Sequence, residues 1–163
     1  MWRITMNLYI KQKVFSWSDK FSIFDEAGNP RFYVEGEVFS FGKKLRIYDL
    51  GGNELAYIEQ KVWSFLPKFN IYRGGEHFCT VVKSFTFFRN EYLIDELGWR
   101  VDGNFWDHEY YISDGSRDIV SVYKEWFTWG DTYAVSIDDD ADMIAALATV
   151  IVIDACIEAQ RNS

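Results

Sequence analysis

An acidic and then almost wholly apolar stretch stands near the C-terminus: Asp138-Asp-Asp-Ala-Asp-Met-Ile-Ala-Ala-Leu-Ala-Thr-Val-Ile-Val-Ile-Asp-Ala-Cys-Ile-Glu158. Its uncharged run, residues 143–153, is well short of the roughly 20 residues that cross a bilayer core. Apolar residues occupy every side of its helical wheel, as in a helix surrounded by protein. The aspartates before it suit a helix N-terminus. We therefore expect a buried, non-transmembrane helix over about residues 140–160, roughly 30 Å long.

Upstream of this helix, five segments share an aromatic residue or a leucine two positions before an isoleucine. A glycine-containing turn signal follows each segment, so each unit predicts a strand, a turn and a return strand. The return strands are predicted at residues 31–41, 54–61, 77–87, 100–111 and 118–126. With strands at 9–15 and 132–137, about twelve antiparallel strands result. The repeated isoleucines are Ile23, Ile47, Ile71, Ile94 and Ile112.

Twelve strands that close on themselves leave a lumen too wide for inward side chains alone, since about eight strands is where those suffice. The apolar helix supplies the missing filling. The sequence thus predicts a mainly β fold: a closed, about twelve-stranded antiparallel barrel at about 5–137 around a C-terminal helix. Its 163 residues suit one domain, 1–163. Cys79 and Cys156 fit no metal or redox spacing and are expected to be reduced core residues.

The net charge of −8, from 17 Lys and Arg against 25 Asp and Glu, repels phosphate backbones, so no nucleic-acid partner is expected. The charges are unevenly spread: residues 1–89 carry 13 basic and 9 acidic side chains, and residues 90–163 carry 4 and 16. The start has no apolar stretch of signal-peptide length, which favours a cytoplasmic location.

Residues 9–49, YIKQKVFSWSDKFSIFDEAGNPRFYVEGEVFSFGKKLRIYD, closely resemble the opening of the YxjI-type, LURP-one-related proteins. The resemblance extends over the whole chain, to the acidic turn and the helix with Asp154. It implies a tubby C-terminal-like fold, in which a twelve-stranded barrel encloses a hydrophobic helix. In that superfamily tubby proteins bind phosphoinositides, phospholipid scramblases are membrane-associated, and plant LURP-one relatives are linked to defence. The resemblance assigns no biochemical role to the bacterial-type members and matches no binding residue here.

Several basic side chains lie on strands that are expected to be neighbours. Aromatic residues such as Phe41, Trp63 and Phe65 are interleaved with them. This pattern is typical of a peripheral protein on an anionic lipid surface. The alternative is ordinary strand faces, with cations outside and rings in the core. The candidate lipid-binding residues are Lys11, Lys13, Lys20, Lys43, Lys44 and Arg46.

Four acidic residues are candidates for more specific roles. Asp138, Asp140 and Asp142 have the oxygen density that calcium prefers, although Met143 and Thr149 break the EF-hand pattern; the alternative is helix capping. Asp154 interrupts the apolar helix, and a buried carboxylate needs a partner. We expect it near a barrel mouth, capping a loop or pairing with a strand Arg or Lys, or else serving as a site residue at the barrel end.

Enzyme motifs are absent from the sequence. His108-Glu109 fails the metalloprotease pattern because Ile112 stands where the second histidine belongs. No cofactor is expected. The favoured prediction is a non-enzymatic tubby-like protein that binds anionic phospholipid head groups, as a peripheral membrane protein, or a protein partner. The alternative is a small apolar ligand in a cleft at the barrel end.

Overall fold

The computed structural model describes residues 4–11, 20–37, 41–85, 90–125 and 132–161. These residues form a closed antiparallel barrel in which each strand pairs with its neighbours in sequence and β1 pairs with β12. The strands are β1 (Thr5–Lys11), β2 (Lys20–Phe24), β3 (Pro30–Gly36), β4 (Lys44–Asp49), β5 (Glu54–Gln60), β6 (Lys68–Arg73), β7 (Glu76–Phe85), β8 (Asn90–Ile94), β9 (Trp99–Asn104), β10 (Glu109–Ser113), β11 (Asp118–Glu125) and β12 (Thr132–Asp138).

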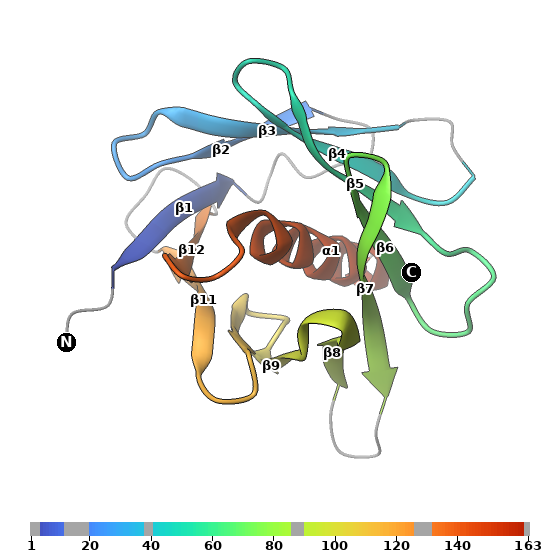
Figure 1. Ribbon diagram of the computed structural model, residues 1–163. Coiled ribbons are helices and arrows are strands. Elements are labelled where there is room, and N and C mark those ends of the chain that lie inside the picture. Colours follow the sequence, from blue (N-terminus) through green and yellow to red (C-terminus); the bar gives the residue numbers. More distant parts are fainter. Residues whose placement is uncertain (1–3, 12–19, 38–40, 86–89, 126–131, 162–163) are drawn as a thin grey trace.

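Helix α1 (Met143–Arg161) runs through the barrel, with strands on every side (Figure 1). Side chains all around its wheel, including Leu147, Val150 and Ile151, are 0% exposed. Thr149, the polar residue in its middle, donates its hydroxyl to the Ala145 carbonyl at 2.8 Å and so satisfies itself within the helix. The predicted barrel around a central helix is therefore confirmed. Among the described residues, no helix is both long enough and apolar enough to span a membrane.

The five repeated isoleucines, one each on β2, β4, β6, β8 and β10, face the helix, and all are 0% exposed. In four of these strands the register shifts immediately after the isoleucine, between Ile23 and Phe24 in β2 and at the equivalent position in β4, β6 and β10. A bulge bends the strand and increases its twist. The repeated motif therefore marks both an inward side chain and the point where each hairpin bends into its turn.

The prediction of one return strand over 100–111 is wrong. β9 ends at Asn104, and a turn over residues 105–108 separates it from β10. The turn is made by side chains: Asn104 Nδ2 donates to Asp107 Oδ2 at 2.7 Å, and the Asp107 backbone N–H donates to Asn104 Oδ1 at 3.3 Å. The Asp102-Gly103 pair just before this turn is a sequence signal for a hairpin, and the predicted continuous strand did not take it into account. The turn also places His108 inside the barrel end.

Replacing Leu147 with alanine tests the packing of the helix. Because Leu147 is fully buried, Leu147→Ala should lower the free energy of unfolding by about 2–5 kcal/mol. The control is Leu50→Ala at a position 62% exposed, where the change should be near zero. Urea denaturation monitored by circular dichroism measures both, and equal stabilities of the two variants would contradict a helix packed in the lumen.

Candidate functional site

Two ends of the barrel carry different polar groups. In an antiparallel meander, the connections after even-numbered strands share one end, where α1 begins, and those after odd-numbered strands share the other. The first end holds the acidic residues before the helix. The second holds the β3–β4 and β5–β6 loops and the β9–β10 turn, close to where the helix ends.

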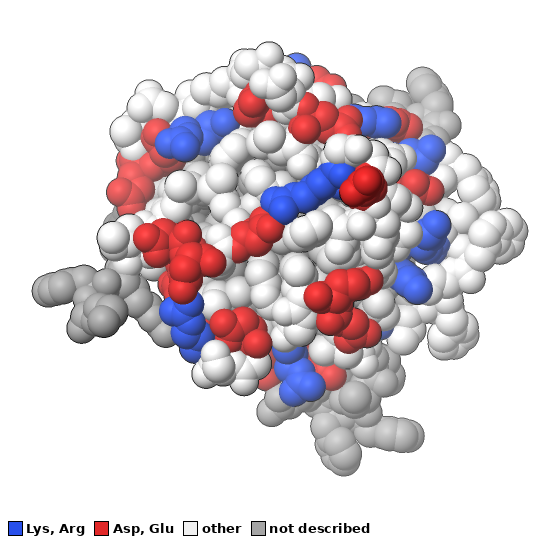
Figure 2. All heavy atoms as spheres, viewed as in Figure 1, with Lys and Arg blue, Asp and Glu red and all other residues white. Residues whose placement is uncertain are grey.

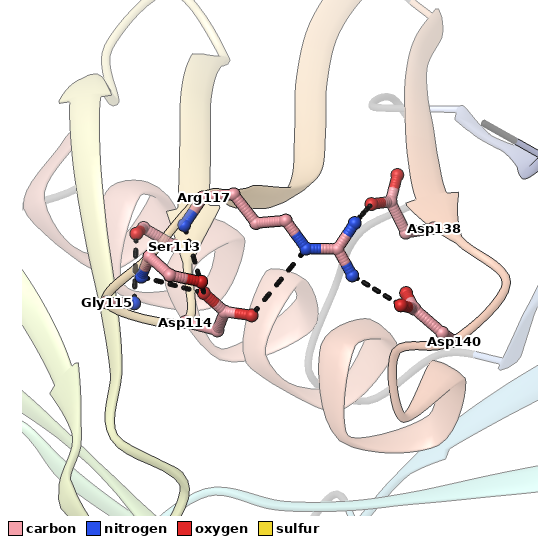
Figure 3. A network of polar contacts seen from close by, with 7 residues as sticks. Ser113, Asp114, Gly115, Arg117, Asp138 and Asp140 are labelled. Carbon is pink, nitrogen blue, oxygen red and sulfur yellow. Dashed lines mark hydrogen bonds and ion pairs between the residues drawn. The ribbon is translucent and has the colours of Figure 1, made fainter. Parts of the chain in front are cut away.

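At the first end, the predicted calcium candidates are engaged with two arginines. Arg73 of β6 donates two hydrogen bonds to the Asp142 carboxylate, at 2.7 and 2.6 Å. Arg117 lies between Asp138, at 3.0 Å, and Asp140, and also faces Asp114 (Figure 3). Calcium at these carboxylates would have to displace the guanidinium groups. Within the described ranges, no group of three or more histidine, cysteine or acidic residues is placed to hold a metal ion.

Asp142 also caps the helix, the role that the sequence offered as the alternative to calcium binding. The side-chain Oδ1 of Asp142 accepts a hydrogen bond from the Ala145 backbone N–H at 3.0 Å. The Asp142 backbone carbonyl accepts a hydrogen bond from the Ala146 backbone N–H at 2.9 Å. This side-chain contact satisfies one of the free N–H groups of the first helical turn. One carboxylate therefore fixes the start of α1 and joins it to the end of β6.

The predicted lipid-binding cations do not gather on one open face. Strand β3 lies between β2 and β4, and its end supplies the acids: Lys20 Nζ is 2.8 Å from Glu35, and Arg46 bonds Glu37. The hydrogen bond from Arg46 lowers the pKa of Glu37. On the face shown in Figure 2, basic side chains likewise lie beside acidic ones.

The other members of this predicted set have different surroundings. Lys44 Nζ is 4.0 Å from Glu37, and Lys11 Nζ lies 5.4 Å from the centre of the Phe24 ring. Lys43 is half-buried, and this burial lowers its pKa. Lys13 lies outside the described residues. Lipid binding by these six residues as one surface stays a prediction.

An overlapping set of side chains, which keeps the predicted Lys44 and aromatic residues and adds Lys61 and Lys68, forms an exposed aromatic and basic surface at the second end. Phe41, Trp63 and Phe65 are 75%, 91% and 102% exposed, and the Phe41 and Trp63 ring centres are 6.1 Å apart. A cleft of about 580 Å³ between the two loops is lined by rings and lysines. We refer to this set as the aromatic loop surface; it comprises Phe41, Trp63, Phe65, Lys44, Lys61 and Lys68.

The two loops that carry this surface are braced against each other. The Lys61 backbone N–H donates to the Lys68 carbonyl at 2.8 Å, which closes the β5–β6 loop. The Gln60 backbone N–H donates to the Lys43 carbonyl at 2.8 Å, which joins this loop to the β3–β4 loop. Gly42 has φ +83°, and a Cβ there would lie 2.5 Å from Val62 Cγ1. Only glycine therefore lets the β3–β4 loop approach this closely. The rings are held by their loops while their faces remain exposed.

Beneath the second end lies a buried pair of titratable residues. Asp154 is 1% exposed, and its Oδ1 is 2.8 Å from Nε2 of His108, which is 2% exposed. His108 has a left-handed backbone, φ +54°, and its ring stacks on Tyr133 at 4.9 Å. The expected Arg or Lys partner for Asp154 is thus replaced by a histidine. This partner was missed because the strand predicted over 100–111 ran through the turn that holds His108.

The second carboxylate oxygen of Asp154 and a nearby tyrosine hydroxyl are also buried. Asp154 Oδ2 and the Tyr110 hydroxyl have no hydrogen-bond partner in the part of the chain that the structure describes. Burial, and then the Asp154 carboxylate, raise the pKa of Tyr110 well above its usual value. Because His108 and Asp154 are closed off from solvent, their contact serves to join the helix to the β9–β10 turn. The pair therefore belongs to the core rather than to the exposed surface.

The cysteines also belong to the core. Both are free and buried, as predicted. Burial raises the pKa of Cys79 to about 12 and that of Cys156 to about 11. Both are therefore protonated thiols at neutral pH, and a thiol in that form is a poor nucleophile.

Comparison with known proteins shows which family the chain belongs to. A family model described as LURP-one-related matches residues 6–154, from β1 to the buried Asp154. The chain belongs to the LURP-one-related family. It is 40% identical over 149 residues to a Bacillus subtilis relative named "Uncharacterized protein YxjI", which covers 91% of this chain and 92% of that one. The resemblance stated from residues 9–49 is thereby confirmed.

The barrel of this LURP-one-related chain is also similar to a solved structure. The X-ray structure of an Arabidopsis thaliana protein superposes with a TM-score of 0.70, covering 93% of this chain and 91% of the plant chain, at 16% identity. At that identity the likeness supports the shared fold alone. The aromatic loop surface must therefore be argued from its own chemistry.

Removing the Asp142 carboxylate should destabilise the protein. Asp142→Ala deletes the helix cap and the Arg73 partner, so the free energy of unfolding should fall by about 1–2 kcal/mol. The matched control is Asp139→Ala, an exposed aspartate of the same cluster, which should change stability little. Thermal denaturation compares them, and an equal loss in both variants would show that general negative charge, rather than the cap, matters here.

The buried pair makes a second prediction. Asp154→Leu removes the acceptor and leaves the buried His108 nitrogen unsatisfied, which should cost about 1–3 kcal/mol of unfolding free energy. Asp154→Asn keeps an oxygen acceptor and should lose less. Urea denaturation ranks the three proteins. A leucine variant as stable as the wild type would contradict the pairing role of Asp154.

Proposed function

We propose that this LURP-one-related protein binds anionic phospholipid head groups at a membrane surface through its aromatic loop surface, without catalysing a reaction. The observation that carries the proposal is the near-complete exposure of Phe41, Trp63 and Phe65 beside three lysines. We further propose a cytoplasmic location, where the adjoining membrane leaflet is the one rich in anionic lipid.

The rings support the proposal because large aromatic side chains gain free energy by leaving water. At a lipid interface, tryptophan and phenylalanine lie at the boundary between head groups and acyl chains. Trp63 and Phe65 are at the tip of the β5–β6 loop, where they can enter a bilayer surface without any rearrangement of the barrel. Because Gly42 and Val62 hold the two loops together, the rings would insert as one preformed unit.

The lysines supply the electrostatic part. A whole-chain charge of −8 repels an anionic surface, so attraction must be local. Lys44, Lys61 and Lys68 line the cleft between the loops, and Glu59 is the one acidic residue among the described lining residues. Each lysine near a membrane surface contributes about 1 kcal/mol and acts within a Debye length. Binding should therefore weaken as salt is added.

The alternative function, binding of a small apolar ligand, would use the same cleft. Its volume, about 580 Å³, is within the range of small-molecule sites, and its walls include Phe41 and Trp63. An apolar ligand would depend on the rings and not on the lysines. It would also bind independently of salt, which separates it from lipid binding.

Flotation with liposomes tests the proposal. The purified protein should float with vesicles that contain phosphatidylserine or a phosphoinositide, stay unbound with phosphatidylcholine alone, and dissociate in high salt. Replacing Lys61 and Lys68 by glutamine should weaken binding at least about tenfold. Parallel samples with calcium test whether Asp138, Asp140 and Asp142 contribute.

Matched variants make the result specific. Trp63→Ser with Phe65→Ser should abolish flotation, whereas Leu50→Ser, an exposed apolar residue at the other barrel end, should not affect it. Lys20→Gln is the charge control for the lysines, because Lys20 is paired with Glu35. Absence of flotation under every condition would refute the proposal and leave a protein partner or a small ligand. Equal loss with Leu50→Ser would refute the assignment to this surface.

A further inference from the structure

A second cleft lies on the outer face of the barrel over β1, away from the aromatic loop surface. It measures about 350 Å³. It forms beside the seam between β1 and β2, which among the described residues pair at two positions, Tyr9 with Phe24 and Ile10 with Ile23. The β2–β3 turn lies alongside β1, held by a hydrogen bond from Asn7 to Glu26. Six lining residues matter for the argument: Tyr9, Lys11, Phe24, Glu26, Glu125 and Thr132.

Carboxylates surround the aromatic rings of this cleft. Burial, then Tyr123, Glu26 and Glu125, raise the pKa of Tyr9, so both glutamates lie near its ring. Asp25 also lines the cleft, but its Oδ1 is taken up by the backbone N–H groups of Ala27 and Asn29, at 3.0 and 2.9 Å. Among the described residues that line the cleft, Lys11 is the only basic one and three are acidic, so this part of the surface is locally acidic.

The cleft already shows which group its rings accept. The ammonium group of Lys11 lies over the Phe24 ring, 5.4 Å from the ring centre. A ring face attracts a cation through its quadrupole, and nearby carboxylates add to that attraction. Lys11 itself is exposed, so the contact can open to solvent and free the ring for a competing cation.

A buried polar group adds a second observation. Thr132 is 4% exposed and lines the same cleft, and its Oγ1 has no hydrogen-bond partner among the described residues. A buried hydroxyl without a partner costs free energy that a bound polar group can recover. An N–H donor of a ligand next to Thr132 would supply the missing hydrogen bond.

We infer that this outer cleft is a binding site for an organic ammonium ion. The aromatic rings distinguish such a cation from inorganic ions, which prefer cages of oxygen ligands. The excess of carboxylates excludes anions. The ammonium group comes either from a small free amine or from a lysine side chain of a partner protein. The inference does not depend on membrane binding, because the aromatic loop surface shares no residue with the cleft.

Nuclear magnetic resonance titration tests the site directly. Methylammonium chloride, added at constant ionic strength against sodium chloride, should shift the amide signals of Tyr9, Phe24 and Thr132 in a saturable way, while sodium should not. Absence of saturable shifts at these residues would overturn the inference. A parallel titration with an end-blocked Gly-Lys-Gly peptide distinguishes the two sources. Tighter binding of the peptide assigns the site to a partner's lysine, and tighter binding of methylammonium assigns it to a small amine.

Two variants sharpen the test. Glu26→Gln with Glu125→Gln should weaken binding about fivefold, and Lys11→Met should strengthen it about threefold, because the internal competitor is removed. Glu76→Gln with Asp95→Asn makes the same change in net charge at exposed positions elsewhere and should leave binding unaltered. Equal weakening by the control pair, or no gain with Lys11→Met, would contradict a site built around the Phe24 ring.

Discussion

A closed barrel of twelve strands must fill its lumen, and α1 is the element that does so. Inward side chains alone fill barrels of about eight strands, so the wider wall here is stable only around the helix. The helix has the complementary need: a surface apolar on all sides, with Leu147 and Ile151 fully buried, cannot face water. Neither part can bury its apolar surface without the other. Barrel and helix are therefore expected to fold as one cooperative unit.

Polar contacts at both ends fix the helix along the lumen. Asp142 joins its first turn to Arg73 on β6, and Asp154 joins its later part to His108 in the β9–β10 turn. Apolar packing by itself permits a helix to slide or rotate, whereas each of these contacts is made at one position only. At the second end, backbone hydrogen bonds within and between the β3–β4 and β5–β6 loops keep Phe41, Trp63 and Phe65 in place while their rings stay exposed.

The sequence predicted the architecture because its main signals are strong and local. The repeated isoleucines and turn glycines predict the hairpins, and the uniformly apolar stretch predicts the buried helix. The family resemblance implies the same fold. The sites were less predictable because they depend on which side chains meet across strands. The lipid-binding prediction considered the cations without the acidic residues beside them. In the structure, Glu35 pairs with Lys20 and Glu37 pairs with Arg46, and both glutamates come from the end of β3. His108 was missed because one strand was predicted through its turn, despite the Asp102-Gly103 signal. Lys61 and Lys68 could be grouped with the exposed rings only from the loop geometry.

Hydrogen exchange along α1 tests the dependence of barrel and helix on each other most directly. Native-state exchange under increasing denaturant measures the free energy at which each amide opens. The amides of Leu147 to Ile153 should open only by global unfolding, with the same free energy and denaturant dependence as the amides of Ile47 and Ile71 in the wall. Opening of the helix amides at a much lower free energy, while the strands stay protected, would show that the helix leaves an intact barrel and would contradict the account.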